Sequence, residues 1–342
     1  MGFSAKNIIS RATGKLHRIA FTIAGKCGAC ETDNTIVIAG SPRSGTTLLL
    51  EALSMLPGYK MINEPLIQQH LQKKHGFNPR TYIQEGQQAP TRQKFLLQVL
   101  QGQMDSSARW MFKSNSELGH IIEHGTTNKL LVKFCRINRL LPWFAEEFGV
   151  RGIIFIVRHP CAVVNSMIRY GQWDKWTPEF FHSNRQDPAS SVCISQLPDA
   201  VQHVFAPVIE RVSTQAEALT VIWCLDHYLP LIQADNHPWI LVPYERLITN
   251  SHKELTRITD ALGLELNDKV LSAMNKPSRS VKDSEKGNTI PPILKWKKQL
   301  TARQIDEILS IIDAVNLSFI YSDSTEPDYE RMNTLQRRQW QW

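Results

Sequence analysis

The 342-residue sequence predicts an α/β fold in which helices cover both faces of a central, mainly parallel β-sheet, a three-layer α/β/α arrangement. Two strand–turn–helix units support this prediction. The first has an apolar strand at 35–39, a turn bounded by glycines and a helix at 46–56. The second has a strand at 152–157, a polar turn and a helix at 161–169. Such units are typical of right-handed βαβ crossovers, which place neighbouring strands parallel.

The remaining elements extend this pattern along the chain. Further strands are expected at 59–62, 129–133 and 239–244, with a strand or strand end at 109–116. Helices are expected at 91–103, 138–148, 213–232, 247–262 and 301–315, loop with helix fragments at 67–90, and loop at 277–292. Gly263 is the expected C-cap of the helix before it, and Thr301 is the expected N-cap of the last helix.

Composition divides the chain into three parts. Residues 1–34 form a basic leading segment, 35–320 form the main domain, and 321–342 form a C-terminal tail without a usable periodicity. Within the domain, 173–198 is aromatic and interrupted by prolines, which indicates an insertion or a lid. No window approaches the roughly 20 apolar residues of a membrane span. We favour a docked or frayed helix for the leading segment over a basic amphipathic helix lying on a membrane.

Composition also narrows the classes of function. An apolar fraction of 42% and a charged fraction of 21% are ordinary for a soluble globular protein. A net charge of +7 is suited to binding an acidic ligand or an anionic surface, and it is equally explained by a basic surface kept for solubility. The sequence has no long Lys/Arg tract, so binding of nucleic acid is not favoured. Six cysteines are too sparse for a disulfide framework, and the Cys27–Cys30 pair lacks a second pair at a zinc spacing. We expect a cytoplasmic protein, with the leading segment as the candidate for contact with the inner face of a membrane.

The segment Gly40-Ser-Pro-Arg-Ser-Gly-Thr-Thr47 carries the strongest signal. Its frame follows the nucleotide P-loop, in which backbone N–H groups at a helix N-terminus bind phosphate. Thr46, however, occupies the position of the phosphate-binding lysine, and the loop carries Arg43 instead. Loss of that lysine argues against hydrolysis of ATP or GTP. We therefore expect a P-loop-like fold that binds a different nucleotide.

Pro42-Arg-Ser-Gly-Thr-Thr47 resembles, at every position, the 5′-phosphosulfate loop of sulfotransferases that use 3′-phosphoadenosine 5′-phosphosulfate (PAPS). The resemblance points to the bacterial or tyrosylprotein- and carbohydrate-sulfotransferase-like branch of that superfamily and covers residues 35 to about 315. It implies that the cofactor is bound by loop residues Arg43, Ser44, Gly45, Thr46 and Thr47.

A second family signature lies on the second strand–turn–helix unit. Arg158 and Ser166 stand eight residues apart, as do the family residues that bind the 3′-phosphate of PAPS. Arginine suits this role because its planar guanidinium forms bidentate hydrogen bonds with phosphate. Tyr244 resembles the family tyrosine that packs on or near adenine.

Glu64 is the best candidate for the general base. Pro65 biases it out of helical geometry, which places its carboxylate at the end of the strand at 59–62. It stands 21 residues after Arg43, an offset similar to that in tyrosylprotein sulfotransferases. An attacking hydroxyl needs such a carboxylate to accept its proton. His159 is the rival base, but it lies within the 3′-phosphate motif.

Further roles are implied by the same resemblance. Lys133, on a strand 25 residues before Arg158, resembles a second family cation, with Lys113 as its rival. Ser280, with Ser278 as its rival, resembles a late serine that some branches direct at the sulfate.

Together these residues predict an enzyme that transfers the sulfuryl group of PAPS in line to a hydroxyl acceptor and releases adenosine 3′,5′-bisphosphate (PAP). The resemblance implies that Glu64 is the base, that Arg43 and Lys133 stabilise charge, and that no metal is required. The expected acceptor is a glycan, lipid-linked sugar, metabolite or tyrosine, with carbohydrate favoured on family grounds. Two alternatives remain: a P-loop kinase or NTPase, and a non-catalytic nucleotide-binding protein of the same fold.

Overall fold

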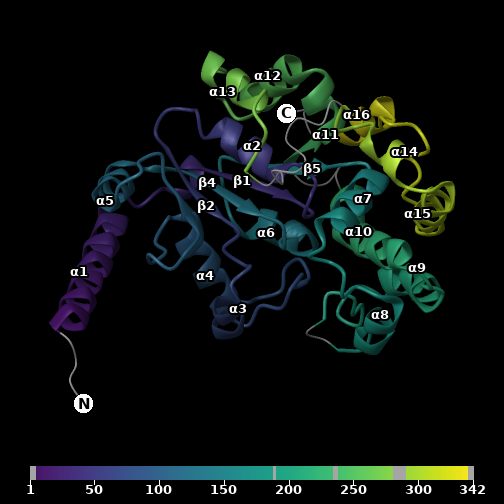
Figure 1. The fold of residues 1–342 in the computed structure, drawn as a ribbon, viewed down its shortest axis with the longest axis horizontal. Helices are drawn as coiled ribbons and strands as arrows, with labels where there is room; N and C mark the ends of the chain where they lie inside the picture. The colour runs from purple at the N-terminus through teal and green to yellow at the C-terminus, as the bar shows by residue number, and fades with distance from the viewer. Residues whose placement is uncertain (1–4, 188–189, 234–237, 280–289, 338–342) are drawn as a thin grey trace.

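The computed structural model describes residues 5–187, 190–233, 238–279 and 290–337. Within them the predicted α/β class is confirmed, because helices cover both faces of a six-stranded sheet of order β3-β2-β4-β1-β5-β6 (Figure 1). The strands are β1 (Thr35–Gly40), β2 (Tyr59–Asn63), β3 (Trp110–Met111), β4 (Lys129–Phe134), β5 (Gly152–Val157) and β6 (Trp239–Pro243). Neighbouring strands are parallel except for the short β3, which pairs antiparallel with β2.

Alternate side chains of β1 enter the two halves of the core, as a strand buried on both faces requires. Ile36 and Ile38 pack with α2 (Thr46–Leu53), α11 (Tyr244–Thr249), α12 (Ser251–Ala261) and α13 (Asp268–Met274). Val37 and Ala39 join the larger cluster on the other face, which includes α4 (Pro90–Leu100), α6 (Leu141–Glu147), α7 (Pro160–Tyr170), α10 (Gln215–Ile232) and α15 (Ala302–Ala314).

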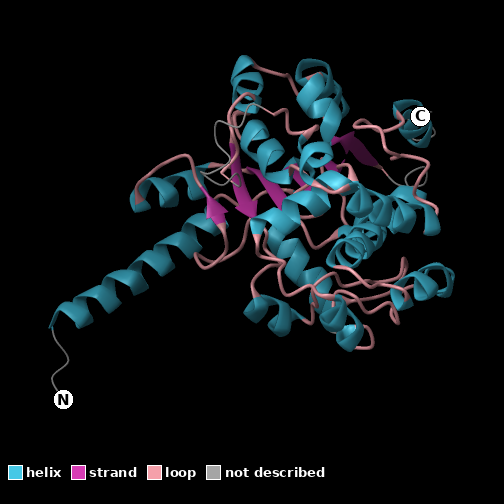
Figure 2. Ribbon diagram, turned by 45° about the vertical axis from the view of Figure 1, so that its right-hand side comes forward, coloured by secondary structure: helices cyan, strands magenta, loops and turns pink. Residues whose placement is uncertain are grey.

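The other described helices surround these layers. They are α1 (Ala5–Cys27), η1 (Thr32–Asn34), α3 (Gln69–His75), α5 (Glu117–Thr126), η2 (Asn138–Leu140), α8 (Pro178–Asn184), α9 (Asp199–Glu210), α14 (Lys295–Gln299) and α16 (Tyr329–Arg337). The helix α1 extends away from the body and meets it at α5 (Figures 1 and 2).

Several predicted boundaries are corrected. The helix expected at 247–262 is two helices, α11 and α12, which break at Asn250. The strand expected at 109–116 is only the two residues of β3, and the helix expected at 138–148 begins as the 3₁₀ turn η2. The helix α16 forms in the predicted tail, where Met332 is buried and the Arg246 guanidinium lies 4.1 Å from the ring centroid of Tyr329.

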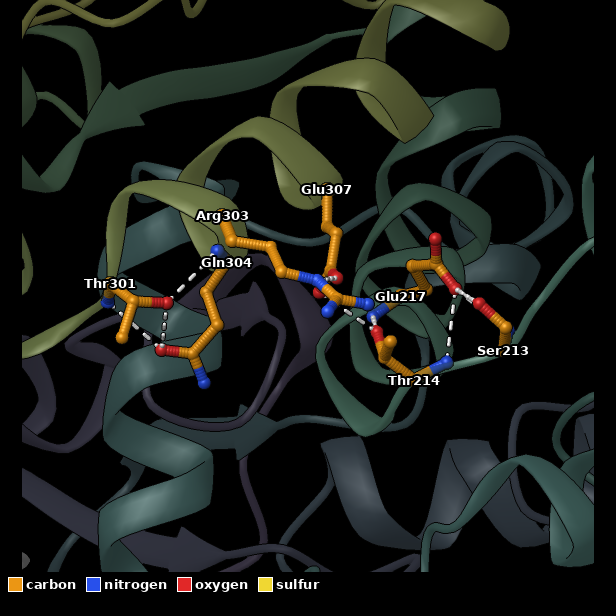
Figure 3. A network of polar contacts seen from close by, with 7 residues as sticks. All are labelled: Ser213, Thr214, Glu217, Thr301, Arg303, Gln304 and Glu307. Atoms are coloured by element: carbon orange, nitrogen blue, oxygen red, sulfur yellow. Dashed lines mark hydrogen bonds and ion pairs between the residues drawn. The ribbon is translucent and has the colours of Figure 1, made fainter.

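Two helices begin with reciprocal capping boxes, shown in Figure 3. At the start of α15 the Thr301 hydroxyl accepts from the Gln304 N–H (3.2 Å), and the Gln304 side chain accepts from the Thr301 N–H (3.0 Å), which confirms Thr301 as the N-cap. Thr214 and Glu217 do the same for α10. The Thr214 hydroxyl also donates to Glu307 of α15 (3.0 Å), so one cap joins both helices.

Candidate active site

The turn between β1 and α2 is arranged to bind an anion. Gly45 precedes α2 with a φ of 96°, and a Cβ there would lie 2.3 Å from the ring of Tyr244, so both conformation and space require glycine. Gly45, the N-cap residue, has no side chain with which to cap α2, which leaves the first N–H groups of the helix available to a ligand. Ser44 is buried, and its hydroxyl donates to the carbonyl of Ser41, so this side chain holds the turn itself.

Arg43 connects the two predicted nucleotide motifs. Its Nε donates to the Ser166 hydroxyl on α7 (3.0 Å), and its guanidinium lies 4.4 Å from the ring centroid of Tyr170. Its backbone carbonyl accepts from Arg158, at the end of β5 (2.9 Å). The Arg158 guanidinium lies 4.2 Å from the ring centroid of Tyr244. The structure therefore brings the loop, Arg158, Ser166 and Tyr244 into one site.

Two cavities meet at Arg43. The larger has a volume of about 600 Å³, and its walls include Thr46, Thr47, Glu64, Lys133 and Arg136. The smaller has a volume of about 110 Å³, and its walls include Arg158, Ser166, Tyr244, Lys295 and Trp296. The predicted base and the predicted 3′-phosphate residues thus line two different cavities, and Arg43 lines both.

Glu64 is buried among groups that favour its ionised form. The Lys133 ammonium lies 3.1 Å from Oε1, the Arg136 guanidinium lies 3.7 Å from Oε2, and Oε2 accepts from the Cys135 N–H (3.0 Å). Burial opposes ionisation, but these cations and the hydrogen bond outweigh it and lower the pKa of Glu64. Lys133 also donates to the Thr47 hydroxyl in the loop (3.2 Å). One cation therefore touches both the loop and the predicted base.

Two of these residues have strained backbones. Arg43 and Glu64 adopt φ values of 70° and 58°, a region that residues other than glycine seldom occupy. Such strain persists only where surrounding contacts hold it, and it is common at functional sites.

The protein-family model for the sulfotransferase family matches residues 35–268, more than half of the chain. The chain belongs to the sulfotransferase family. No significant match was found among curated proteins. Among solved structures, this chain is similar to the sulfotransferase domain of the Synechococcus PCC 7002 olefin synthase. The two share 18% identity over 84% of this chain and 95% of that domain, with a TM-score of 0.44.

Two further solved structures are similar to this sulfotransferase. The sulfotransferase domain from the curacin biosynthetic pathway has 16% identity over 82% of this chain and 96% of its own, with a TM-score of 0.42. Mouse sulfotransferase SULT7A1 complexed with PAP has 13% identity over 94% of both chains, with a TM-score of 0.39. The family assignment rests on the match of the family model to the sequence.

The rival candidates His159, Lys113 and Ser278 lie outside the two cavities. His159 is buried, its Nδ1 accepts from the Cys161 N–H, and its Nε2–H donates to the Ser322 carbonyl (3.0 Å). Burial lowers its pKa to about 4, so the ring is neutral near pH 7. His159 is not among the residues that line either cavity. Lys113 donates to the Leu56 carbonyl (3.4 Å) rather than lining the site. Ser278 is buried outside both linings, and Ser280 lies outside the described residues.

Sequence reasoning missed several cavity residues of the sulfotransferase. Arg136 follows β4 at the carboxyl edge of the sheet, where α/β proteins bind ligands, so its position was a usable signal. Arg109 and Arg279 reach the cavity from segments that are distant in the sequence, whereas Trp173 reaches it from the aromatic segment expected to be an insertion or a lid. Within the described ranges, no group of three or more His, Cys, Asp or Glu side chains is arranged to hold a metal ion.

Proposed function

We propose that this sulfotransferase transfers the sulfuryl group of PAPS to an acceptor hydroxyl, with Glu64 as the general base. The observation that carries the proposal is the position of Lys133, 3.2 Å from the Thr47 hydroxyl of the loop and 3.1 Å from the Glu64 carboxylate. In-line transfer needs the leaving and attacking oxygens on opposite sides of the moving group. The loop would hold the leaving oxygen, and Glu64 would lie beside the attacking oxygen. Because Lys133 contacts both the loop and Glu64, this arrangement suits in-line transfer.

The nucleotide is proposed to span both cavities. The 3′-phosphate would be bound by Arg158 and Ser166 in the smaller cavity, with Tyr244 beside the nucleotide. The 5′-phosphosulfate would be bound by Arg43, Thr46, Thr47 and the first N–H groups of α2. This assignment is supported by the contacts of Arg43 with both Arg158 and Ser166.

The proposed reaction follows from these positions. The acceptor oxygen forms a bond to sulfur, the bond from sulfur to the 5′-phosphate oxygen breaks, and the acceptor proton moves to Glu64. Arg43, Lys133 and the loop N–H groups stabilise the charge that develops on the leaving oxygen of PAP. A carboxylate with a lowered pKa suffices as the base, because the transition state is loose and the acceptor proton is lost late.

The acceptor is proposed to enter the larger cavity past Trp173. Trp173 also lines a neighbouring cavity of about 420 Å³, whose walls include Trp176, Phe180, Gln69, Gln72 and Asn184. Aromatic faces with amide groups between them suit a carbohydrate, which presents both C–H faces and hydroxyls. We therefore propose carbohydrate as the first acceptor class to test, with 173–198 covering it.

Transfer of the sulfur radiolabel from PAPS to a panel of glycans, phenols and peptides tests the proposal. We expect labelled product with at least one hydroxyl acceptor, and a rate of labelling lower by about 10²–10⁴-fold when Glu64 is replaced by glutamine. PAP binding without transfer to any acceptor would favour the non-catalytic alternative. Phosphoryl transfer from ATP, with no transfer from PAPS, would favour the kinase alternative.

A further inference from the structure

The helix α1 is fixed at its base and projects from the body at its other end (Figures 1 and 2). Its C-terminal half packs on α5, with Phe21 and Ala24 buried. The Phe21 ring stacks on the ring of His124 in α5, with 4.3 Å between the centroids. The direction of the projecting part is therefore set by the fold.

A buried lysine completes the base of α1. Lys60 of β2 donates to the carbonyl of Gly28, just after α1 (2.6 Å), and to the carbonyl of His124, near the end of α5 (2.9 Å). Both acceptors lie where helix dipoles attract a cation. A Cβ on Gly28 would lie 2.1 Å from the His124 carbonyl oxygen. The backbone after α1 and the backbone of α5 therefore approach as closely as glycine allows. The helix is thus anchored in the fold rather than frayed at this end.

The exposed face of α1 is apolar. Leu16, Ile19 and Ile23 are 67%, 48% and 57% exposed, and their spacing places them on one side of the helix. On α5, Leu118 and Ile122 are 67% and 55% exposed. The three α1 residues form what we call the apolar face. Together with the two α5 residues they make up most of the large apolar side chains exposed among the described residues. Several large apolar side chains exposed on one side of a helix mark an interaction site.

Positive charge accompanies this face. Lys15, Arg18 and Lys26 are exposed on the same helix, and the sequence of α1 contains five Lys or Arg residues and no Asp or Glu. No helix of the described part of the chain is long and apolar enough to cross a bilayer. An amphipathic, purely basic helix of this kind lies in a membrane interface rather than across it. Pairing of α1 with a second copy would bring like charges together, which disfavours that occupant.

We propose that α1 docks this protein on an anionic lipid bilayer, with the apolar face in the interface and Lys15, Arg18 and Lys26 against lipid headgroups. Trp110 packs edge-on against Phe21 at 5.9 Å between centroids and also lines the 600 Å³ cavity. The docked helix is therefore one side-chain contact away from the reaction cavity. This proposal does not depend on the reaction that the cavity performs.

Co-sedimentation of the full chain with vesicles tests the proposal. We expect binding to vesicles that mix phosphatidylglycerol with phosphatidylcholine, weak binding to phosphatidylcholine alone, and weakening with added salt because the charges are screened. The triple substitution Leu16→Ser, Ile19→Ser and Ile23→Ser should abolish binding. Each charge removed by Lys15→Gln or Arg18→Gln should weaken binding on the order of fivefold. Lys73→Gln and Lys74→Gln, on exposed α3 positions, and Ile232→Ser, at an exposed apolar position on α10, are the matched controls.

An unchanged melting temperature of each variant shows that loss of vesicle binding is not loss of the fold. The proposal is overturned if the chain binds neither vesicle type, or if the triple variant binds as the unsubstituted chain does. A third result would also overturn it: the unsubstituted chain does not bind vesicles but forms a dimer in light scattering, and the triple variant is a monomer. The apolar face would then bind a second copy of the chain.

Discussion

Glu64 and Lys133 contact each other through both backbone and side chain. The Glu64 N–H donates to the Lys133 carbonyl (2.8 Å), and the Lys133 ammonium lies 3.1 Å from the Glu64 carboxylate. Asn63, the last residue of β2, pairs in register with Lys133 of β4. The register of two parallel strands therefore sets the distance between the proposed base and its cation, and no flexible loop intervenes.

Replacement of Glu64 by glutamine should lower turnover by about 10²–10⁴-fold, the usual contribution of a general base. The amide keeps the shape of the side chain but cannot accept the acceptor proton. Affinity for PAP should be retained, because Arg158 and Ser166 lie in the other cavity. Turnover with radiolabelled PAPS and PAP-dependent melting measure the two quantities. Glu51→Gln, in the same cavity but bonded to the Arg279 N–H, is the control and should retain most of the turnover.

Lys133→Met should change the pH dependence as well as the rate. Turnover requires ionised Glu64, so with its lowered pKa the rate should fall only when the pH drops below the ordinary range of glutamate. Without Lys133, one of the groups that oppose burial is lost, so the pKa of Glu64 should rise and the acidic limb of the pH–rate profile should move to higher pH. Lys113→Met is the matched control, because Lys113 contacts the Leu56 carbonyl outside the cavity. An acidic limb at the same pH in both variants would contradict this role of Lys133.

Gly45→Ala should abolish PAP binding, whereas Gly149→Ala should leave it unchanged. A methyl group at Gly45 meets the Tyr244 ring at 2.3 Å and also sits at a φ of 96°, so the loop and the adenine side of the site must move. A Cβ on Gly149 meets nothing within 4 Å. Melting with and without PAP measures both variants. Equal PAP-induced shifts in the two would show that the loop tolerates a side chain at Gly45.

Lys60→Met should loosen α1 while leaving PAP binding intact. The substitution leaves the Gly28 and His124 carbonyls without their donor, and a buried unsatisfied polar group costs about 1–3 kcal/mol. Hydrogen exchange should accelerate in the last turns of α1 and α5. Lys129→Met, on β4 with its ammonium 5.8 Å from the Tyr59 ring centroid, is the control. Equal exchange in both variants would mean that Lys60 does not hold the base of α1.

The features that could be predicted from the sequence are those that depend on residues adjacent in the chain. The strand at 152–157, the loop from Gly40 to Thr47 and the cap at Thr301 each depend on a local pattern, and the fold class follows from repetition of that pattern. Lys133 is preferred to Lys113 because it lies 25 residues before Arg158, although both lysines end short candidate strands. The strand order, which places β4 between β1 and β2, explains why Lys133 lines the cavity and Lys113 does not.

The remaining features depend on contacts between distant residues. Lysine is rarely fully buried, so the sequence gives no sign that Lys60 lies beneath α1 and α5. The break at Asn250 interrupts a helical periodicity that continues on both sides of it, so 247–262 was predicted as one helix. Trp173 and Arg279 reach the cavity only because tertiary packing brings their segments there.

The most direct test of PAPS as the donor is thermal unfolding with PAP, compared with ATP and Mg²⁺, for the unsubstituted chain and for Arg158→Ala. A ligand at one hundred times its Kd adds about 2.7 kcal/mol to the free energy of unfolding and raises the Tm. The account predicts a rise with PAP that Arg158→Ala abolishes, and no rise with ATP and Mg²⁺. A rise with ATP and Mg²⁺ alone would contradict it and favour a P-loop kinase.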